Sequence, residues 1–361
     1  MKILYDYEIF YQQKYGGISN YYFNLCKEMI KLNNDLIVSC FLYKSKYISN
    51  LPKKYFNGLD VNYIPHTFNK FIESINHHYS KNIKKNFSPD IIHQTYYSNR
   101  IEPGKRVCTV YDLINEKFPE YFKNAEKISE LKKKTLDNSD HVICISENTK
   151  KDLIDIFKVP DKKISITYLA SPYTNQINTN SNKKFKNHLL YVGSRKAYKN
   201  FNGLLKAISL SKFLKNNYKI IAFGGEKYNK DDYEIIKKYK LDKSQVLFVN
   251  DKDYNLDFLY SNVDALIYPS IYEGFGIPLL EAMNFGCPVI SSFKGSLREV
   301  GGNGINYFDP KNPENISEII EKVICSEDMI KRSVLYGYER TKLFSWSECA
   351  KKTLEIYKNI I

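Results

Sequence analysis

The chain has 361 residues, enough for about two domains, and its 43% hydrophobic and 15% aromatic content excludes a disordered or low-complexity protein. Its 54 Lys and Arg against 40 Asp and Glu give a formal net charge of +14, which points to nucleic acid, an anionic membrane surface or a negatively charged substrate. The excess divides evenly, with +7 in residues 1–170 and +7 in the remainder, so it does not form a basic tail.

The first half of the chain alternates short apolar runs with longer amphipathic stretches, which is typical of a parallel sheet covered by helices. Helices are expected from Ile18 to Leu32 and from Glu147 to Phe157, the second with Ser146 as its N-cap. Strands are expected at residues 2–6, 35–42, 89–94, 106–111, 141–145 and 163–168.

The polar, aperiodic segment 171–186 predicts a linker. A second alternating series follows it, with strands expected in HLLYVGS, YKIIAFGG, QVLFVN, DALIYPS, PVISS and INYFDP. We therefore expect an α/β protein with two Rossmann-like, doubly wound domains facing a cleft, at residues 1–170 and 187–345. Ligands of such sheets bind beyond the carboxyl ends of the strands.

Cysteine usage and hydropathy bear on the compartment. The seven cysteines are odd in number, widely spaced and without a Cys-x-x-Cys pair, which favours reduced thiols in a cytoplasmic protein. Asp6 and Glu8 stand where a signal peptide needs an apolar run, and no stretch of 18 apolar residues occurs. The basic cluster Lys81, Lys84 and Lys85 is read as a solvated helix face, with peripheral contact to the inner face of the cytoplasmic membrane as the alternative.

The most informative segment is YPSIYEGFGIPLLEAMNFGCPVISS, residues 268–292. A strand ends in a loop with Glu273, Gly274 and Gly276, and a helix opens near Ile277. Glu281 follows on that helix, eight residues after Glu273. Carboxylates accept paired hydrogen bonds from vicinal hydroxyls of a ribose or a hexose. Each glutamate alone reads as an ordinary loop or helix residue, but the whole pattern favours a binding site.

A second segment, VGSRKAYKN, places basic residues at a strand end. The strand ends at Gly193, and Arg195, Lys196 and Lys199 follow before a helix. Such side chains suit a diphosphate, Arg as a bidentate donor and Lys as a point charge. For Lys196 a charge on a surface helix is an equal alternative. Gly17 belongs to a glycine pair between an expected strand and an expected helix. This weaker pattern is typical of a phosphate-binding turn but equally of an ordinary tight turn.

In combination these motifs resemble those of the retaining, GT-B-fold glycosyltransferases of glycosyltransferase family 4, in particular bacterial polysaccharide mannosyltransferases. EGFGIPLLEA is similar to the E-x7-E motif of that family, and VGSRKAYKN to its Arg/Lys phosphate-binding segment. KYGGISNYYFNL, VYDLINEKFPEYF, ISENTKKDL and LFSWSECAKKTLEIY are similar to stretches at corresponding points of one bacterial branch. The resemblance covers essentially the whole chain.

The resemblance implies a role for each matched residue. Glu281 would bind the nucleotide ribose, Glu273 the transferred sugar, and Arg195 with Lys199 the diphosphate leaving group. The helix at residues 346–361 would cross back onto the N-terminal domain. Further contacts to the nucleotide sugar are implied for Gly17, Gly193, Asn250, Asp251, Gly274, Phe275, Gly276 and Ile277.

The chain departs from the family pattern at Tyr111-Asp112, where many members have a His-Asp pair whose histidine contacts the donor sugar. Asp112 is therefore the residue expected to contact donor sugar or acceptor here. His93, at the end of DIIHQ, has two interpretations, a contact to the acceptor or a structural hydrogen bond, and the second is favoured. The Asp-x-Asp at residues 251–253 matches a metal signature of a different glycosyltransferase fold and is interpreted as a chance match. No metal and no cofactor are expected.

The sequence thus predicts a metal-independent, retaining hexosyltransferase of bacterial surface polysaccharide or glycan synthesis. The preferred donor is GDP-mannose, with UDP and dTDP sugars as alternatives, and the acceptor is a saccharide, free or lipid-linked. A nucleotide-sugar epimerase and a non-enzymatic polyanion-binding protein are rival interpretations. The single Trp and the absence of a basic-aromatic recognition motif argue against nucleic acid.

Overall fold

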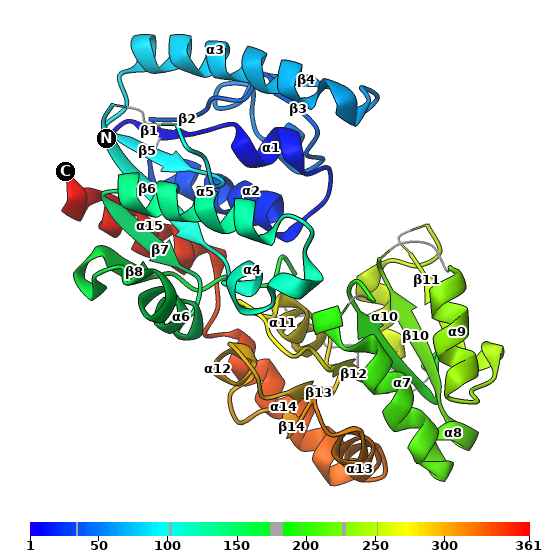
Figure 1. The fold of residues 1–361 in the computed structure, drawn as a ribbon. Coiled ribbons are helices and arrows are strands. Elements are labelled where there is room, and N and C mark those ends of the chain that lie inside the picture. The colour runs from blue at the N-terminus through cyan, green and yellow to red at the C-terminus, as the bar shows by residue number, and fades with distance from the viewer. Residues whose placement is uncertain (34, 101–102, 174–182, 196, 226–228, 251) are drawn as a thin grey trace. The chain divides into compact units, whose positions relative to one another are not determined.

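The computed structural model describes residues 1–33, 35–100, 103–173, 183–195, 197–225, 229–250 and 252–361. The chain forms two compact units, one made of Met1–Leu169 with Trp346–Ile361 and the other of Ala170–Ser345. Each unit is built on a six-stranded sheet (Figure 1). Most of the expected linker, 171–186, lies outside the described residues.

The first unit holds a parallel sheet with the strand order β2-β1-β5-β6-β7-β8. Its strands are β1 (Ile3–Tyr5), β2 (Leu36–Val38), β5 (Ile91–Gln94), β6 (Lys105–Val110), β7 (His141–Cys144) and β8 (Ile164–Ile166), and a separate pair is formed by β3 (Leu42–Tyr43) and β4 (Leu59–Asp60). Its helices are α1 (Glu8–Gln12), α2 (Gly17–Leu32), α3 (Asn69–Phe87), α4 (Ile114–Lys117), α5 (Ala125–Asn138), α6 (Glu147–Phe157) and α15 (Trp346–Ile360). The strand order reverses between β1 and β5, which is the topological switch point of this sheet.

Local sequence signals explain the ends of these elements. The side chain of Ser146 accepts a hydrogen bond from the backbone N–H of Thr149 at 3.0 Å, so α6 begins where its N-cap predicts. Helix α15 packs along α2, and Tyr357 on α15 is fully buried there. Most residues of these strands are apolar and buried, as expected for a parallel sheet covered on both faces.

The second unit holds a parallel sheet with the order β11-β10-β9-β12-β13-β14. Its strands are β9 (His188–Val192), β10 (Lys219–Phe223), β11 (Val246–Val249), β12 (Ala265–Tyr268), β13 (Val289–Ser292) and β14 (Asn306–Phe308). Its helices are α7 (Phe201–Leu210), α8 (Lys212–Asn217), α9 (Lys230–Lys238), α10 (Leu256–Asn262), α11 (Ile277–Asn284), α12 (Leu297–Gly301), α13 (Pro313–Ile324) and α14 (Glu327–Thr341). Strands β10 and β11 are added on one side of β9, and β12, β13 and β14 follow on its other side. The topological switch point therefore lies between β9 and β12.

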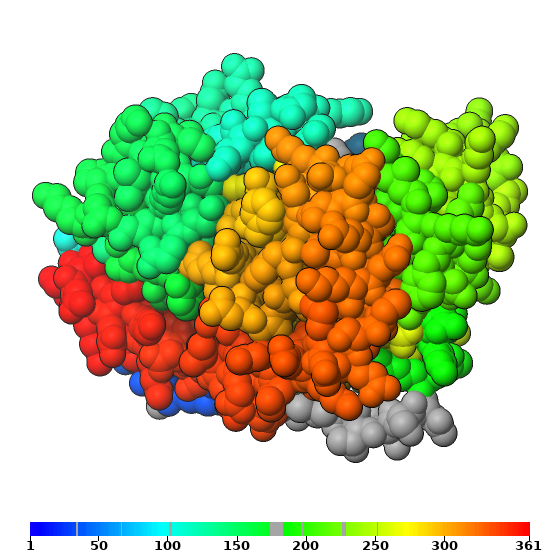
Figure 2. All heavy atoms as spheres, turned by 90° about the horizontal axis from the view of Figure 1, so that it is seen from below, coloured from blue at the N-terminus to red at the C-terminus, as the bar shows by residue number. Residues whose placement is uncertain are grey.

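The core of the second unit lies between its sheet and the helices α7 and α13, where Leu189, Ile267 and Ile320 are fully buried. Helix α14 packs against α13 and α11, and Figure 2 shows the orange segments that include α13 and α14 as a continuous surface. The two parallel sheets confirm the predicted α/β architecture with two Rossmann-like units. None of the helices in the described ranges combines the length and apolar content needed to cross a bilayer.

Candidate functional site

The loops that leave β9 and β10 adopt backbone conformations that favour glycine. Gly193, directly after β9, has φ +137°, and Gly224 and Gly225, after β10, have φ +87° and +80°. The backbone N–H of Gly193 donates to the carbonyl of Phe223 at 3.0 Å, which holds the two loops together. Side chains other than glycine rarely adopt these angles, so the loops keep bare backbone at the carboxyl ends of both strands.

Lys199 and Glu273 form an ion pair at the switch point between β9 and β12. The Lys199 Nζ lies 2.6 Å from Glu273 Oε1 and donates to the Tyr268 hydroxyl at 3.0 Å. Both side chains are mostly buried, with 15% and 13% of their surface exposed. Burial disfavours the charged amine, but the Glu273 carboxylate outweighs burial and raises the pKa of Lys199 well above its ordinary value. Lys199 therefore stays protonated at neutral pH.

The loop that carries Glu273 is anchored from behind by residues that follow β13. The Ser296 hydroxyl donates to the Glu273 carbonyl at 3.0 Å, and the Ser296 N–H donates to the same oxygen at 3.2 Å. Gly295 has φ +61°, and a β-carbon there would lie 2.7 Å from the Glu273 carbonyl oxygen. Gly295 thus allows a close approach of two backbones that fixes the position of Glu273.

Arg195 is held by Asp232, the third residue of α9. Its Nε and Nη2 lie 2.8 and 3.0 Å from the two carboxylate oxygens, and its Nη1 donates to the Gly224 carbonyl at 2.9 Å. The guanidinium also lies over the ring of Phe248, 4.8 Å from the ring centroid. Only 7% of each charged side chain is exposed, so Arg195 is directed to Asp232 in this structure.

Glu281 lies in α11, one turn beyond the helix start. Gly276 is the N-cap with φ +100°, and a β-carbon there would lie 2.6 Å from the Leu297 side chain. The Glu281 side chain is buried, with its Oε2 accepting a hydrogen bond from the Tyr260 hydroxyl at 3.0 Å. Burial raises the pKa of Glu281 to about 7, an effect that the Tyr260 hydrogen bond partly opposes.

The structure describes some of the other residues expected in the second unit, and two lie outside the description. Asn250 follows the edge strand β11, and its side chain accepts from the Lys252 N–H at 2.9 Å in a local turn. Asp251 and Lys196 lie outside the described residues. Phe275 is buried with its ring 5.8 Å from that of Phe344. Within the described ranges, no group of three or more His, Cys, Asp or Glu is arranged to hold a metal ion.

The expected residues of the first unit occupy helix starts. Gly17 is the first residue of α2, and a β-carbon there would meet nothing within 4 Å. Asp112 is the second residue after β6, and its Oδ1 accepts from the Ile114 N–H at 3.1 Å at the start of α4. The Asp112 carbonyl accepts from the buried Lys132 amine at 3.0 Å. Tyr111, beside it, is buried among other aromatic rings.

His93 is a structural residue. It is fully buried, its Nδ1 is hydrogen-bonded to the Tyr357 hydroxyl, and its Nε2 lies 2.9 Å from Thr109 Oγ1. Burial lowers the pKa of His93 to about 3, so the ring is neutral at physiological pH. The structural hydrogen bond favoured for His93 is therefore present on both ring nitrogens.

Both halves of the chain match glycosyltransferase families. Residues 15–170 match the family described as Glycosyltransferase Family 4, and residues 173–340 match the family described as Glycosyl transferases group 1. The chain belongs to glycosyltransferase family 4. The resemblance stated from the motifs is therefore confirmed, and the chain is a glycosyltransferase.

Curated members of the family include bacterial mannosyltransferases. O-antigen chain mannosyltransferase B of Escherichia coli is 28% identical over 279 residues, which cover 73% of this chain and 72% of that protein. O-antigen chain mannosyltransferase RfbU of Salmonella typhimurium is 30% identical over 229 residues, which cover 63% of this chain and 63% of that protein. The match therefore spans just under two thirds of RfbU.

Solved structures share the fold over the full chain. Sucrose-phosphate synthase from Thermosynechococcus elongatus superposes with a TM-score of 0.77 at 18% identity, covering 100% of this chain and 99% of that one. WaaG, a glycosyltransferase involved in lipopolysaccharide biosynthesis, superposes with a TM-score of 0.74 at 17% identity, covering 98% of this chain and 99% of that one. Anabaena Alr3699/HepE in complex with UDP and glucose superposes with a TM-score of 0.75 at 15% identity, covering 99% of this chain and 100% of that one. The family 4 chain thus has the GT-B fold.

Three residues that hold Arg195 and Glu273 in place could not be predicted from the sequence of this family 4 chain. Asp232 belongs to the capping box Asn229-x-x-Asp232, a signal that places it at a helix start but does not show that it meets Arg195. Gly295 and Ser296 follow the strand PVISS without a motif of their own. Their contact with Glu273 depends on β12 and β13 being neighbours, which the strand order shows.

Proposed function

We propose that this family 4 glycosyltransferase is a retaining hexosyltransferase that uses a nucleotide diphosphate sugar and a saccharide acceptor. Mannose is the proposed hexose and GDP-mannose the proposed donor, because the two relatives described above are named O-antigen mannosyltransferases. UDP and dTDP sugars are alternatives, and a solved structure of the same fold holds UDP-glucose. Surface polysaccharide synthesis is the proposed setting.

The observation that carries the proposal is the Lys199–Glu273 pair at the β9–β12 switch point. A diphosphate gains negative charge as it departs, and a fixed cation in a mostly buried position stabilises that charge strongly. Glu273 offers a carboxylate next to this cation, and carboxylates accept hydrogen bonds from sugar hydroxyls. The pair therefore supplies the two complementary groups that a donor's diphosphate and hexose require.

The proposed reaction proceeds on one face of the sugar. The bond from the anomeric carbon to the diphosphate oxygen breaks, and its electron pair stays on the diphosphate beside Lys199. The acceptor hydroxyl forms the new bond to the anomeric carbon on the same face, and its proton passes to the departing phosphate oxygen. The anomeric configuration is retained, and no divalent metal takes part.

The remaining residues act around this pair in the proposal. Arg195 binds the diphosphate after exchanging Asp232 for a phosphate oxygen. Glu281 accepts hydrogen bonds from the nucleotide ribose. Asn250 and Asp251 contact the base. In the first unit, Gly17 lies near the diphosphate and Asp112 contacts the donor sugar or the acceptor. The donor is also approached by the backbone of five residues, Gly193, Gly274, Phe275, Gly276 and Ile277. The acceptor is a saccharide, free or lipid-linked, and peripheral contact with the membrane would bring the protein to a lipid-linked one.

A donor panel tests the proposal. The full chain is incubated with GDP-mannose, UDP-glucose, UDP-galactose and dTDP-glucose, with and without saccharide acceptors, in the presence of EDTA. We expect acceptor-dependent nucleotide release from GDP-mannose and a product whose anomeric configuration, read by proton NMR, equals that of the donor. Consumption of a donor into an isomeric nucleotide sugar without any transfer product would contradict the proposal and favour an epimerase.

A further inference from the structure

Tyr268 is the last residue of β12, and its hydroxyl lies beside the Lys199–Glu273 pair. The hydroxyl accepts a hydrogen bond from the Lys199 Nζ at 3.0 Å, and this nitrogen lies 5.3 Å from the centroid of the Tyr268 ring. Only 2% of Tyr268 is exposed. A tyrosine hydroxyl in a buried position needs a hydrogen-bond partner, and Lys199 is a partner of this one.

Two acceptors of different charge hold the Lys199 ammonium group. The group carries three N–H bonds. Glu273 Oε1 accepts from it at 2.6 Å, and the Tyr268 hydroxyl accepts from it at 3.0 Å. A lysine amine held by one acceptor can still pivot about that contact, because its four-carbon stem is flexible. Two acceptors fix the amine in space and so set the direction of its third N–H, which a phosphate oxygen can use.

The two acceptors also differ in how firmly the fold holds them. Glu273 belongs to a loop, whereas Tyr268 belongs to a strand that pairs with β9 and with β13, where its register partner is Ser291. In the proposed reaction the Glu273 carboxylate must also accept hydrogen bonds from the sugar. Side chains on strands hold a reacting group more precisely than side chains on loops. Tyr268 is therefore the firmer support of the amine while Glu273 engages the sugar.

Tyr268 holds the cation without neutralising it. Burial raises the pKa of Tyr268 above its ordinary value, and the Glu273 carboxylate raises it further, although Lys199 opposes both effects. The phenol therefore stays protonated at neutral pH and offers Lys199 a lone pair but no negative charge. A second carboxylate in this position would cancel the charge that a departing diphosphate requires.

Other residues hold the backbone of Lys199. The Tyr191 hydroxyl donates to the Lys199 carbonyl at 3.4 Å. The Nδ2 of the next residue, Asn200, donates to the Pro310 carbonyl at 2.7 Å. Removal of the Tyr268 hydroxyl should therefore leave this backbone in place and release only the amine.

We propose that Tyr268 is a positioning residue of the transfer reaction, whose hydroxyl holds the Lys199 ammonium where its third N–H meets the departing diphosphate oxygen. The inference rests on the proposed function, because Lys199 contacts a diphosphate only there. The negative charge on this oxygen grows as its bond to the anomeric carbon breaks. A displaced amine therefore loses more interaction in the transition state than with the bound donor, which lowers kcat and leaves KM nearly unchanged.

A double-mutant cycle separates positioning from a general structural effect. The variants are Tyr268→Phe, Lys199→Met and the two combined. Their kcat and KM are measured by acceptor-dependent nucleotide release from GDP-mannose, or from the donor that the panel identifies. Tyr22→Phe is the matched control, since Tyr22 is fully buried in the first unit and its hydroxyl donates to the Gln94 carbonyl at 2.9 Å. Thermal melts of all the variants measure the loss of stability.

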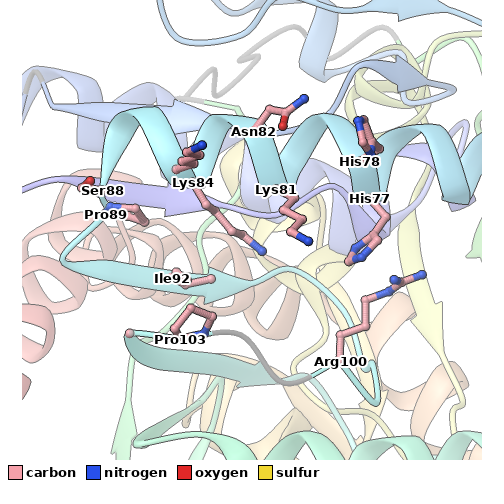
Figure 3. Close-up of a pocket in the computed structure, with 12 residues that line it drawn as sticks. His77, His78, Lys81, Asn82, Lys84, Ser88, Pro89, Ile92, Arg100 and Pro103 are labelled. Carbon is pink, nitrogen blue, oxygen red and sulfur yellow. The ribbon is translucent and has the colours of Figure 1, made fainter.

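Turnover is a sharper readout here than nucleotide binding. A cavity of about 1040 Å³ lies in the first unit between α3 and the region of β5 and β6, and its lining includes Lys81 and Arg100 (Figure 3). Basic surfaces attract anions without specificity. Binding measured in bulk would therefore include nucleotide held away from Lys199, whereas kcat and KM report only the donor that reacts.

We expect Tyr268→Phe to lower kcat about tenfold with KM changed less than twofold. Tyr22→Phe should change kcat less than twofold at a comparable loss of melting temperature. In the Lys199→Met background, Tyr268→Phe should change kcat less than twofold, because the amine that it positions is gone.

Two results would overturn the inference and leave the proposed function in place. They are an unchanged kcat in Tyr268→Phe, and the same fractional loss of kcat from Tyr268→Phe in both backgrounds. Absence of transfer by the unmodified chain with every donor of the panel would overturn the proposed function, and this inference with it.

Discussion

The two sheets reverse their strand order at equivalent places, yet different residues occupy the two switch points. In the first unit Asp6 follows β1, and its Oδ1 accepts from the Thr95 N–H, after β5, at 2.8 Å. Burial raises the pKa of Asp6, an effect that its hydrogen bonds with Thr95 partly oppose. In the second unit the oppositely charged Lys199 and Glu273 meet with part of each side chain still exposed.

The difference shows that topology alone does not create the candidate site. At the first switch point Asp6 is hydrogen-bonded within the fold, and neighbouring Tyr5, Tyr22 and His93 pack ring against ring. At the second, glycine loops and a charged pair remain accessible at the carboxyl edge. We infer that the first edge mainly stabilises its unit and that the second performs the chemistry.

The largest expected effect follows from removing the cation at the second switch point. Lys199→Met should lower the turnover number by about 10²- to 10³-fold, because the departing diphosphate loses its fixed positive charge. Nucleotide release at saturating donor measures it. Lys206→Met, on the exposed face of α7, is the matched control and should leave turnover unchanged.

A double variant separates chemistry from stability in this test. Glu273 without its cation is a mostly buried, uncompensated charge, so Lys199→Met should also destabilise the fold. Lys199→Met/Glu273→Gln should recover the melting temperature but not the turnover. Recovery of turnover along with stability would show that Lys199 has only a structural role.

The next prediction concerns the first switch point. His93→Leu removes the two buried hydrogen bonds that the ring makes with the hydroxyls of Tyr357 and Thr109, and it should lower the free energy of unfolding by about 2 kcal/mol. Urea unfolding at pH 7 measures the loss. The KM for the donor should change less than twofold. A tenfold rise in this KM at unchanged stability would place a ligand at the first edge instead.

Glu281 should make nucleotide affinity depend on pH. Its pKa is raised to about 7, and both ribose hydroxyls can donate to its two oxygens only when it is ionised, so affinity should rise about tenfold from pH 6 to pH 8. Glu281→Gln should flatten this profile. The same raised pKa stabilises the ligand-free fold below pH 4.5, and that contribution is lost as pH rises through about 7.

The smallest effect is expected at the partner of Glu281. Tyr260→Phe removes a hydrogen bond that lowers the pKa of Glu281, so the midpoint of the pH profile should move upward. Nucleotide affinity at pH 7 should fall a few-fold, and the free energy of unfolding by about 1 kcal/mol. Calorimetric titrations between pH 6 and pH 9 measure the shift. A midpoint at lower pH would contradict the assigned hydrogen bond.

Sequence reasoning reached the fold and part of the site for a physical reason. Strand periodicity and caps are local signals, so α6 and the positions of Lys199 and Glu273 at strand ends could be predicted. The contact of Arg195 with Asp232 joins residues 37 apart, and that of His93 with Tyr357 joins residues 264 apart. Such pairs depend on tertiary packing, which no local pattern shows.

Amide hydrogen exchange of the full chain, measured without nucleotide and with saturating GDP or UDP, tests most directly that the second switch point is the donor site. We predict slower exchange at residues 193–200 and 270–284 with the cognate nucleotide, and no change at residues 91–98. Unchanged exchange at both of the first two segments with either nucleotide, or slowing confined to residues 91–98, would contradict it.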